Sequence, residues 1–231
     1  WFPGGDMAQA ELHMRGFLSH PPLVGAAGRI VGDTGTQGSH PGPSLWVAML
    51  PVYVIGGRSS AALMAAVVSV HSASVVAAVW LARRRAGYVF AALVGLVSLA
   101  VIRAAGPDFM IEPWNPWLAV LPFLVFILLV LDVVAPVDGC SEKRRVTALV
   151  AATVIGSHCI QCHAGYLVIV AAMLVISVAT LVRDVGWSAR PVRRAVVWLI
   201  LAAVVMWIPP LLDQLRREPG NISLLLQHFG S

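Results

Sequence analysis

Long apolar runs, bounded by arginines or prolines, constrain this sequence more than any other feature. They recur between residues 60 and 211 and carry almost no charged side chains inside them. Each approaches the length of about 20 residues that a helix needs to cross the hydrocarbon core of a bilayer. The sequence therefore predicts six membrane spans, at residues 60–82, 87–105, 116–134, 146–162, 164–182 and 195–211.

The composition supports a membrane protein and argues against a soluble one. Of the 231 residues, 58% are hydrophobic and only 12% are charged, whereas soluble proteins average about 25% charged residues. The net charge of +5 would suit nucleic acid in a soluble domain, but here the cations gather at the ends of apolar runs. We therefore predict an all-α, polytopic transmembrane helical bundle with no nucleic-acid partner.

The distribution of charge orients the predicted spans. Ten of the sixteen Lys and Arg residues fall in the loops after residues 82, 134 and 182. Alternating spans put these loops on one side, and the positive-inside rule makes that side cytoplasmic. Six of the seven histidines fall on the other side. We expect an integral protein of the plasma membrane with its polar segments facing outward.

Three regions follow from this topology. Residues 1–59 form an external loop with interfacial helices, residues 60–211 form the six-helix transmembrane region, and residues 212–231 begin another external loop. Within the first region, residues 44–56 are apolar but too short for a span, and Trp46 and Tyr53 suit the headgroup depth that amphipathic rings prefer. Because the sequence opens at Trp1, we also expect a further span upstream.

Dense polar strings occur in every external segment and in none of the short, basic cytoplasmic loops. Loops that converge on one face of a rigid scaffold commonly carry a functional site, although external loops are also polar simply because they are wet. The strings are residues 4–13, 37–43, 111–117, 156–163 and 209–215.

Asp6 is the first candidate for chemistry. On a helix that starts near it, Asp6, Gln9 and His13 would share one face. Transfer of an acyl or glycosyl group to a hydroxyl needs a base, and a carboxylate near the membrane surface can serve. Asp after two glycines is equally a good helix N-cap, and the two roles are compatible.

The other candidates are polar side chains of the remaining strings. Arg15 either neutralises a lipid phosphate, as His13 could, or pairs with Glu11 four residues earlier. His40 lies in a Gly- and Pro-rich loop that cannot be helical, where it either contacts a ligand or is solvated. The remaining substrate-binding candidates are Glu112 and Asn115, which flank Trp114, and Gln161 and His163 at an outer helix end.

Residues 159–163, Cys-Ile-Gln-Cys-His, match the attachment pattern of a c-type haem. A zinc site would use His158, Cys159, Cys162 and His163. Neither alternative has further ligands that the sequence identifies, so we expect the cysteines to be small apolar fillers, and we predict no bound cofactor. The need for a divalent metal stays open.

Several strings together resemble the GT-C superfamily of integral membrane glycosyltransferases, in particular actinobacterial arabinofuranosyl- and mannosyltransferases. Gly5-Asp6-Met7 resembles the acidic start of the family's first external loop, residues 40–43 resemble its Pro-rich stretch, and residues 161–163 resemble a Gln-x-His string. The chain departs from many members in having one obvious acid, Asp6, instead of a pair.

The resemblance implies an inverting transferase. The donor would be a polyprenyl-phosphate-linked sugar, the acceptor a hydroxyl of a cell-envelope glycan or glycolipid, and Asp6 the catalytic base. Arg15, Arg58 or Arg216 would hold the phosphate. The alternatives are a transporter or flippase of lipid-linked sugars and, further from the pattern, a haem-carrying redox protein.

Overall fold

The computed structural model describes residues 4–33, 35–187 and 190–230, and most of these residues are helical. The expectation of an upstream span was based on Trp1, which lies outside these ranges. In chain order the elements are α1 (Gly5–Gly16), β1 (Ala27–Val31), β2 (Gln37–Ser39), α2 (Ser44–Ile55), α3 (Ser60–Ala105), η1 (Pro107–Met110), α4 (Asn115–Val134), α5 (Glu142–Cys162), η2 (Ala164–Tyr166), α6 (Leu167–Val185), α7 (Arg190–Arg216) and α8 (Asn221–Gly230).

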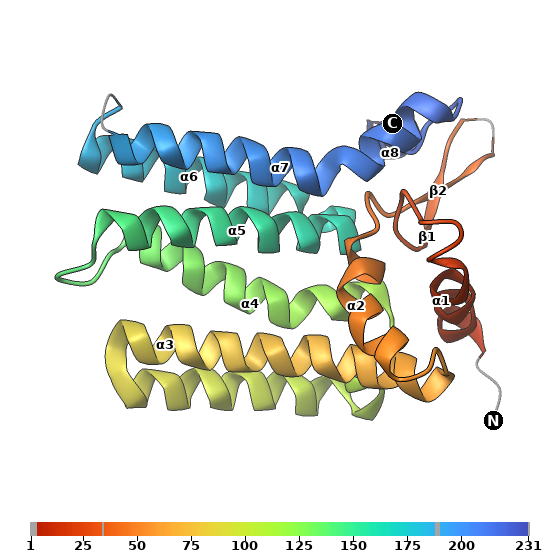
Figure 1. Cartoon of the computed structure of the whole chain (residues 1–231), viewed down its shortest axis with the longest axis horizontal. Coiled ribbons are helices and arrows are strands. Elements are labelled where there is room, and N and C mark those ends of the chain that lie inside the picture. The colour runs from red at the N-terminus through yellow and green to blue at the C-terminus, as the bar shows by residue number, and fades with distance from the viewer. Residues whose placement is uncertain (1–3, 34, 188–189, 231) are drawn as a thin grey trace.

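The helix α3 contains two of the predicted spans. It leaves helical geometry at Ala86 and at Gly87, whose φ of 77° lies in the left-handed region, where glycine is favoured because it has no Cβ. The chain turns back there, and α3 forms two antiparallel limbs (Figure 1). The predicted spans 60–82 and 87–105 therefore correspond to one element with a sharp turn.

The bundle is built around α4, and its outer surface is apolar. Phe126 and Leu149 are fully buried between α4 and its neighbours. By contrast, Leu96 of α3, Val168 of α6 and Val205 of α7 are 62%, 79% and 66% exposed. Soluble proteins rarely expose so extended an apolar surface. Within the described ranges, five helices are long and apolar enough to cross a membrane, namely α3, α4, α5, α7 and α6 with its η2 extension. This confirms the helical-bundle prediction and indicates a membrane protein.

The two ends of the bundle differ in character. The turn of α3 and the loops α4–α5 and α6–α7 lie at one end, called here the basic end (Figure 1). The other end, the capped end, is covered by α1, α2, the β1–β2 hairpin and α8. The prediction that the polar strings share one end, opposite the basic loops, agrees with this arrangement.

Buried ion pairs join the helices at the basic end. The carboxylate of Asp132, which is 4% exposed, lies 3.3 Å from Arg85 of α3 and 2.8 Å from Arg144 of α5. Arg145 pairs with Asp184 of α6 at 2.8 Å. Because desolvated charges need partners, these contacts fix how α3, α4, α5 and α6 meet.

The capped end differs from the prediction in three ways. Residues 1–59 hold the antiparallel β1–β2 hairpin as well as helices α1 and α2. Trp46 and Tyr53 are 1% and 0% exposed, so the expectation that they meet lipid headgroups is wrong: both belong to the core between α2 and α3. Residues 212–230 continue α7 and form α8.

Helix boundaries also shift, for local reasons. α5 begins at Glu142, not at residue 146, because Ser141 caps it by accepting a hydrogen bond from the Arg144 backbone N–H. α7 runs through Pro209 and Pro210, where the predicted span ended. A proline removes one backbone donor but its φ suits a helix, and Asp213 then binds the start of α8 through the Asn221 backbone N–H at 3.0 Å.

Candidate active site

A polar cavity of about 710 Å³ opens at the capped end. It lies between α1, the hairpin, the start of α4, the end of α5 and α8. Four of the eight predicted site residues line it: Asp6, His40, Asn115 and His163. Its other polar lining residues are Gln9, Arg29, Gln37 and His228.

Asp6 lies in the first turn of α1 and is exposed to the cavity. The N-cap residue of that helix is Gly4, and no side chain caps it. The capping interpretation of Asp6 is therefore wrong: the helix begins two residues earlier than the sequence suggested. The carboxylate remains available to a ligand, as a general base must be.

Glu112 approaches Asp6 without lining the cavity. Burial raises the pKa of the Glu112 carboxyl, and the nearby charges of Asp108 and Asp6 raise it further. A raised pKa means that the Glu112 carboxyl holds its proton more tightly than a solvent-exposed glutamate does. The chain thus supplies a second acid next to Asp6 from a different loop.

His40 and His163 form a ring pair in the same cavity, with centroids 5.0 Å apart. Burial first, and the charge of His163 second, lower the pKa of His40 to about 4, so its imidazole is neutral at pH 7. In the part of the chain that the structure describes, His40 Nδ1 is buried without a hydrogen-bond partner.

The turn that follows His163 defines which of its ring nitrogens carries the proton. Its Nδ1 accepts a hydrogen bond from the Gly165 backbone N–H at 3.2 Å, and burial lowers its pKa. A neutral ring whose Nδ1 accepts must carry its proton on Nε2. His163 can therefore offer an Nε2–H donor to an anionic ligand.

Asn115 joins the two helices that frame the cavity floor. It is 8% exposed, and its Nδ2 donates to the Cys162 carbonyl oxygen at 3.0 Å. This bond ties the start of α4 to the end of α5. Asn115 lines the cavity mainly as a positioning residue for His163, which directly follows the end of α5.

The structure does not bring His13 and Arg15 to the polar cavity. The His13 ring stacks on Trp46 at 5.0 Å, and its Nδ1 lies 2.8 Å from the Gln9 carbonyl oxygen. Arg15 pairs with Glu11, which also accepts a hydrogen bond from Ser60 Oγ at 2.6 Å. The pairing interpretation of Arg15 therefore agrees with the geometry.

Arg29 is the residue that sequence reasoning missed. It projects from β1, is exposed, and lines the polar cavity. Among the described residues no acid pairs with it, unlike Arg15. Its local signal is weak, because residues 27–32 lack the alternation of polar and apolar side chains that marks a half-buried strand.

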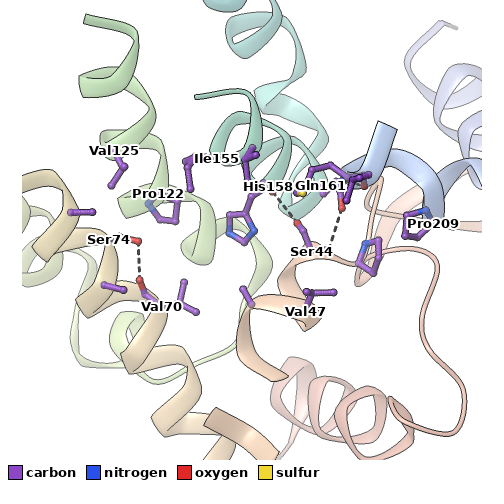
Figure 2. Close-up of a pocket in the computed structure, with 17 residues that line it drawn as sticks. Ser44, Val47, Val70, Ser74, Pro122, Val125, Ile155, His158, Gln161 and Pro209 are labelled. Atoms are coloured by element: carbon purple, nitrogen blue, oxygen red, sulfur yellow. Dashed lines mark hydrogen bonds between the residues drawn. The ribbon is translucent and has the colours of Figure 1, made fainter. Parts of the chain in front are cut away.

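A second, apolar groove of about 570 Å³ lies in the side of the bundle (Figure 2). It is bounded by α2, the first limb of α3, α4, α5 and α7. Its walls are almost wholly apolar and include Val47, Val70, Pro122, Val125 and Ile155.

Gln161 lies at this groove, away from the polar cavity. Its Oε1 accepts from the Ser44 backbone N–H at 3.2 Å, and its Nε2 donates to the Met206 carbonyl oxygen at 2.7 Å. Both ends of the amide are thus engaged, and Gln161 ties α2 and α7 to α5. It acts as a buried connection between elements.

The polar cavity and the apolar groove are lined in part by the same two segments of the chain. His40 and His163 face the first, whereas Ser44 and Gln161, a few residues along the same segments, face the second. Gly42 packs so closely against Gln161 that a Cβ there would collide with its side chain. The two spaces therefore differ in chemistry, one polar and the other apolar, and lie on either side of these packed segments.

The cysteines of the haem-like string are buried in helix packing. Cys159 and Cys162 are 0% and 1% exposed, and Cys162 Sγ lies 3.5 Å from His158 Nε2. Neither thiol lines either space, so the geometry favours their role as apolar fillers. Across the described ranges, no three His, Cys, Asp or Glu side chains are grouped closely enough to hold a metal ion.

Comparisons with known proteins add no likeness: no family model, curated protein or solved structure matches this chain.

Proposed function

We propose that the chain is a membrane glycosyltransferase that transfers a sugar from a polyprenyl-phosphate-linked donor to a cell-envelope acceptor hydroxyl, on the extracytoplasmic side of the plasma membrane. The observation that carries the proposal is a polar cavity lined by Asp6, Arg29 and three histidines, together with a separate apolar groove in the side of the bundle. A lipid-linked sugar has the same two-part character. The earlier resemblance to GT-C enzymes is consistent with this reading.

The chemistry follows from the groups in the polar cavity. The acceptor hydroxyl oxygen attacks the anomeric carbon while Asp6 takes the hydroxyl proton. The bond from the anomeric carbon to the phosphate oxygen breaks with inversion, and the electron pair leaves with the polyprenyl phosphate. Glu112, whose pKa is raised, is the carboxyl better suited to hold a proton beside Asp6.

The leaving phosphate needs cationic or neutral donors, and the cavity offers both. Arg29 can bind it in a charge-assisted, bidentate manner. His163 contributes its Nε2–H as a neutral donor. The prenyl tail would occupy the apolar groove past Val47 and Val70, where burying its methylenes stabilises the complex.

Sugar transfer by the full chain in membrane vesicles tests the proposal. With a polyprenyl-phosphate sugar donor, we expect formation of a glycosidic bond and a loss of at least about 100-fold in rate for Asp6→Asn, the effect typical of removing a general base. The matched control is Asp33→Asn, an exposed carboxylate of the hairpin that does not line the cavity. Full activity of Asp6→Asn would remove Asp6 from the mechanism.

The same assay separates the transporter alternative. Movement of the lipid-linked sugar across the vesicle membrane, with no glycosidic bond formed by the wild-type chain, would support a flippase. In that case Asp6→Asn should leave the transported product chemically unchanged and alter only its rate of movement.

A further inference from the structure

A third space lies far from the candidate active site, on the α5–α7 face of the basic end. It measures about 650 Å³. Val146, Val150, Ala151 and Trp198 form its apolar wall, and an adjoining hollow of about 550 Å³ continues past Val197. The cationic residues around the two spaces are Lys143, Arg190, Arg193 and Arg194. We call this combined depression the α5–α7 groove.

Most cations of the basic end already have partners. Arg85 and Arg144 pair with Asp132, and Arg145 and Arg183 pair with Asp184. Arg83 and Arg84 lie over the rings of Tyr88 and Trp80. These contacts satisfy the arginines within the protein.

The cations of the α5–α7 groove differ. Within residues 4–33, 35–187 and 190–230, none of Lys143, Arg190, Arg193 and Arg194 makes an ion pair or stacks on a ring. One acid, Glu142, lines the same groove, so four cations and one acid leave a surplus of three positive charges. That surplus calls for an anion from outside the chain.

The position of the groove defines what kind of anion fits. Val197 and Trp198 are each 55% exposed on a helix apolar enough to span a membrane, so the apolar wall opens sideways to hydrocarbon. The arginines lie at the helix end, at headgroup level. Basic pockets between transmembrane helices bind anionic lipid headgroups in this way.

We propose that the α5–α7 groove binds an anionic phospholipid of the leaflet at the basic end. The phosphate lies among Arg190, Arg193 and Arg194, and an acyl chain lies along Val146 and Val150. This inference does not depend on the glycosyltransferase proposal.

Lipid retention by the purified full chain tests the proposal. The chain is exchanged into mixed micelles holding phosphatidylglycerol or phosphatidylcholine, and bound lipid is counted by native mass spectrometry. We expect phosphatidylglycerol to bind at least tenfold more tightly than phosphatidylcholine. Replacing the three arginines together by Gln should weaken its binding roughly 100-fold, at roughly fivefold per arginine.

Three further variants keep the result interpretable. Arg83→Gln with Arg84→Gln removes equal charges elsewhere at the basic end and should change binding less than twofold. Glu142→Gln should strengthen binding, which a misfolded variant could not imitate. Val150→Phe should weaken binding with every charge intact, because it fills the apolar wall.

Several outcomes would overturn the proposal. Equal binding of the two lipids, or equal losses from the Arg83/Arg84 and Arg190/Arg193/Arg194 variants, would show a general surface attraction. Displacement of the lipid by millimolar glycerol 3-phosphate would show a phosphate site that makes no use of the apolar wall. Unchanged binding in Val150→Phe would have the same meaning.

Discussion

His40 shows how one side chain at the capped end couples burial to charge. Its backbone is fixed by the segment before β1, since the His40 N–H donates to the Ala26 carbonyl oxygen at 2.9 Å and the His40 carbonyl oxygen accepts from the Gly25 N–H at 3.0 Å. The His40 ring packs against the His163 ring. Protonation of a buried histidine in this position should lower the stability of the fold as well as change ligand binding in the polar cavity.

This arrangement gives a pH-dependent prediction. The pKa of His40 is lowered from 6.5 to about 4 in the folded chain, so between these values the unfolded chain binds a proton that the folded chain excludes. Stability at this position is therefore fully present above about pH 6.5 and falls as the pH drops toward 4. We expect His40→Gln to lose less Tm than wild type between pH 7.5 and 4.5, measured by tryptophan fluorescence in detergent.

The control for His40 is His20→Gln, an exposed histidine of the same region. Its Tm should follow the wild-type pH dependence. Identical slopes for His40→Gln and wild type would contradict the assignment of the acid sensitivity to His40.

At the scale of elements, α8 holds the hairpin in place. Asn221 is 6% exposed, and its side chain imitates a strand: Oδ1 accepts from the Ser39 backbone N–H at 2.7 Å, and Nδ2 donates to the Ser39 carbonyl oxygen at 3.0 Å. Because Ser39 precedes His40, this contact sets the position of one wall of the polar cavity.

Removal of the Asn221 side chain should therefore loosen the hairpin. Asn221→Ala leaves the Ser39 groups without partners, which costs about 1–3 kcal/mol of unfolding free energy. Hydrogen exchange of residues 27–39 should speed up in this variant. Asn221→Asp keeps the acceptor and loses the donor, so its exchange rates should lie between those of wild type and Asn221→Ala. Exchange rates in Asn221→Ala equal to those of wild type would contradict the role of Asn221 in holding the hairpin.

The hairpin also marks the limit of what the sequence could predict. Apolar runs of about 20 residues constrain a chain strongly, so the spans were predicted to within a few residues. Arg29 and Asn221 are different, because their roles depend on contacts between segments far apart in the chain. No local pattern encodes the bond from Asn221 to Ser39, and without it the strand that carries Arg29 resembles a polar loop.

The buried connections of α5 show the same limit. Gln161 was predicted to bind substrate because it stands beside His163 in a polar string. Successive positions on a helix differ by about 100° in direction, so Gln161 faces the Met206 carbonyl oxygen of α7, whereas His163, just past the helix end, faces the polar cavity. Proximity in the sequence did not determine which space each side chain lines.

At the scale of the whole molecule, the glycosyltransferase proposal depends on which end faces which compartment. The unpaired cations of the α5–α7 groove and the ion pairs of Asp132 and Asp184 lie at the basic end, whereas the polar cavity lies at the capped end. Loops rich in Lys and Arg stay cytoplasmic. The capped end should then face outward, where a cell-envelope acceptor would be found.

The native cysteines make this orientation measurable. Cys140 lies partly exposed in the loop between α4 and α5 at the basic end, whereas the other two thiols are buried. In intact cells a membrane-impermeant maleimide should leave Cys140 unlabelled and should label it in inside-out vesicles. With Cys140→Ser as background, Ser19→Cys, on the exposed segment after α1, should show the opposite pattern. Labelling of both positions from the same side would contradict a bundle whose basic and capped ends lie on opposite sides of the membrane. It would also contradict the placement of Asp6 and Arg29 in the outer compartment.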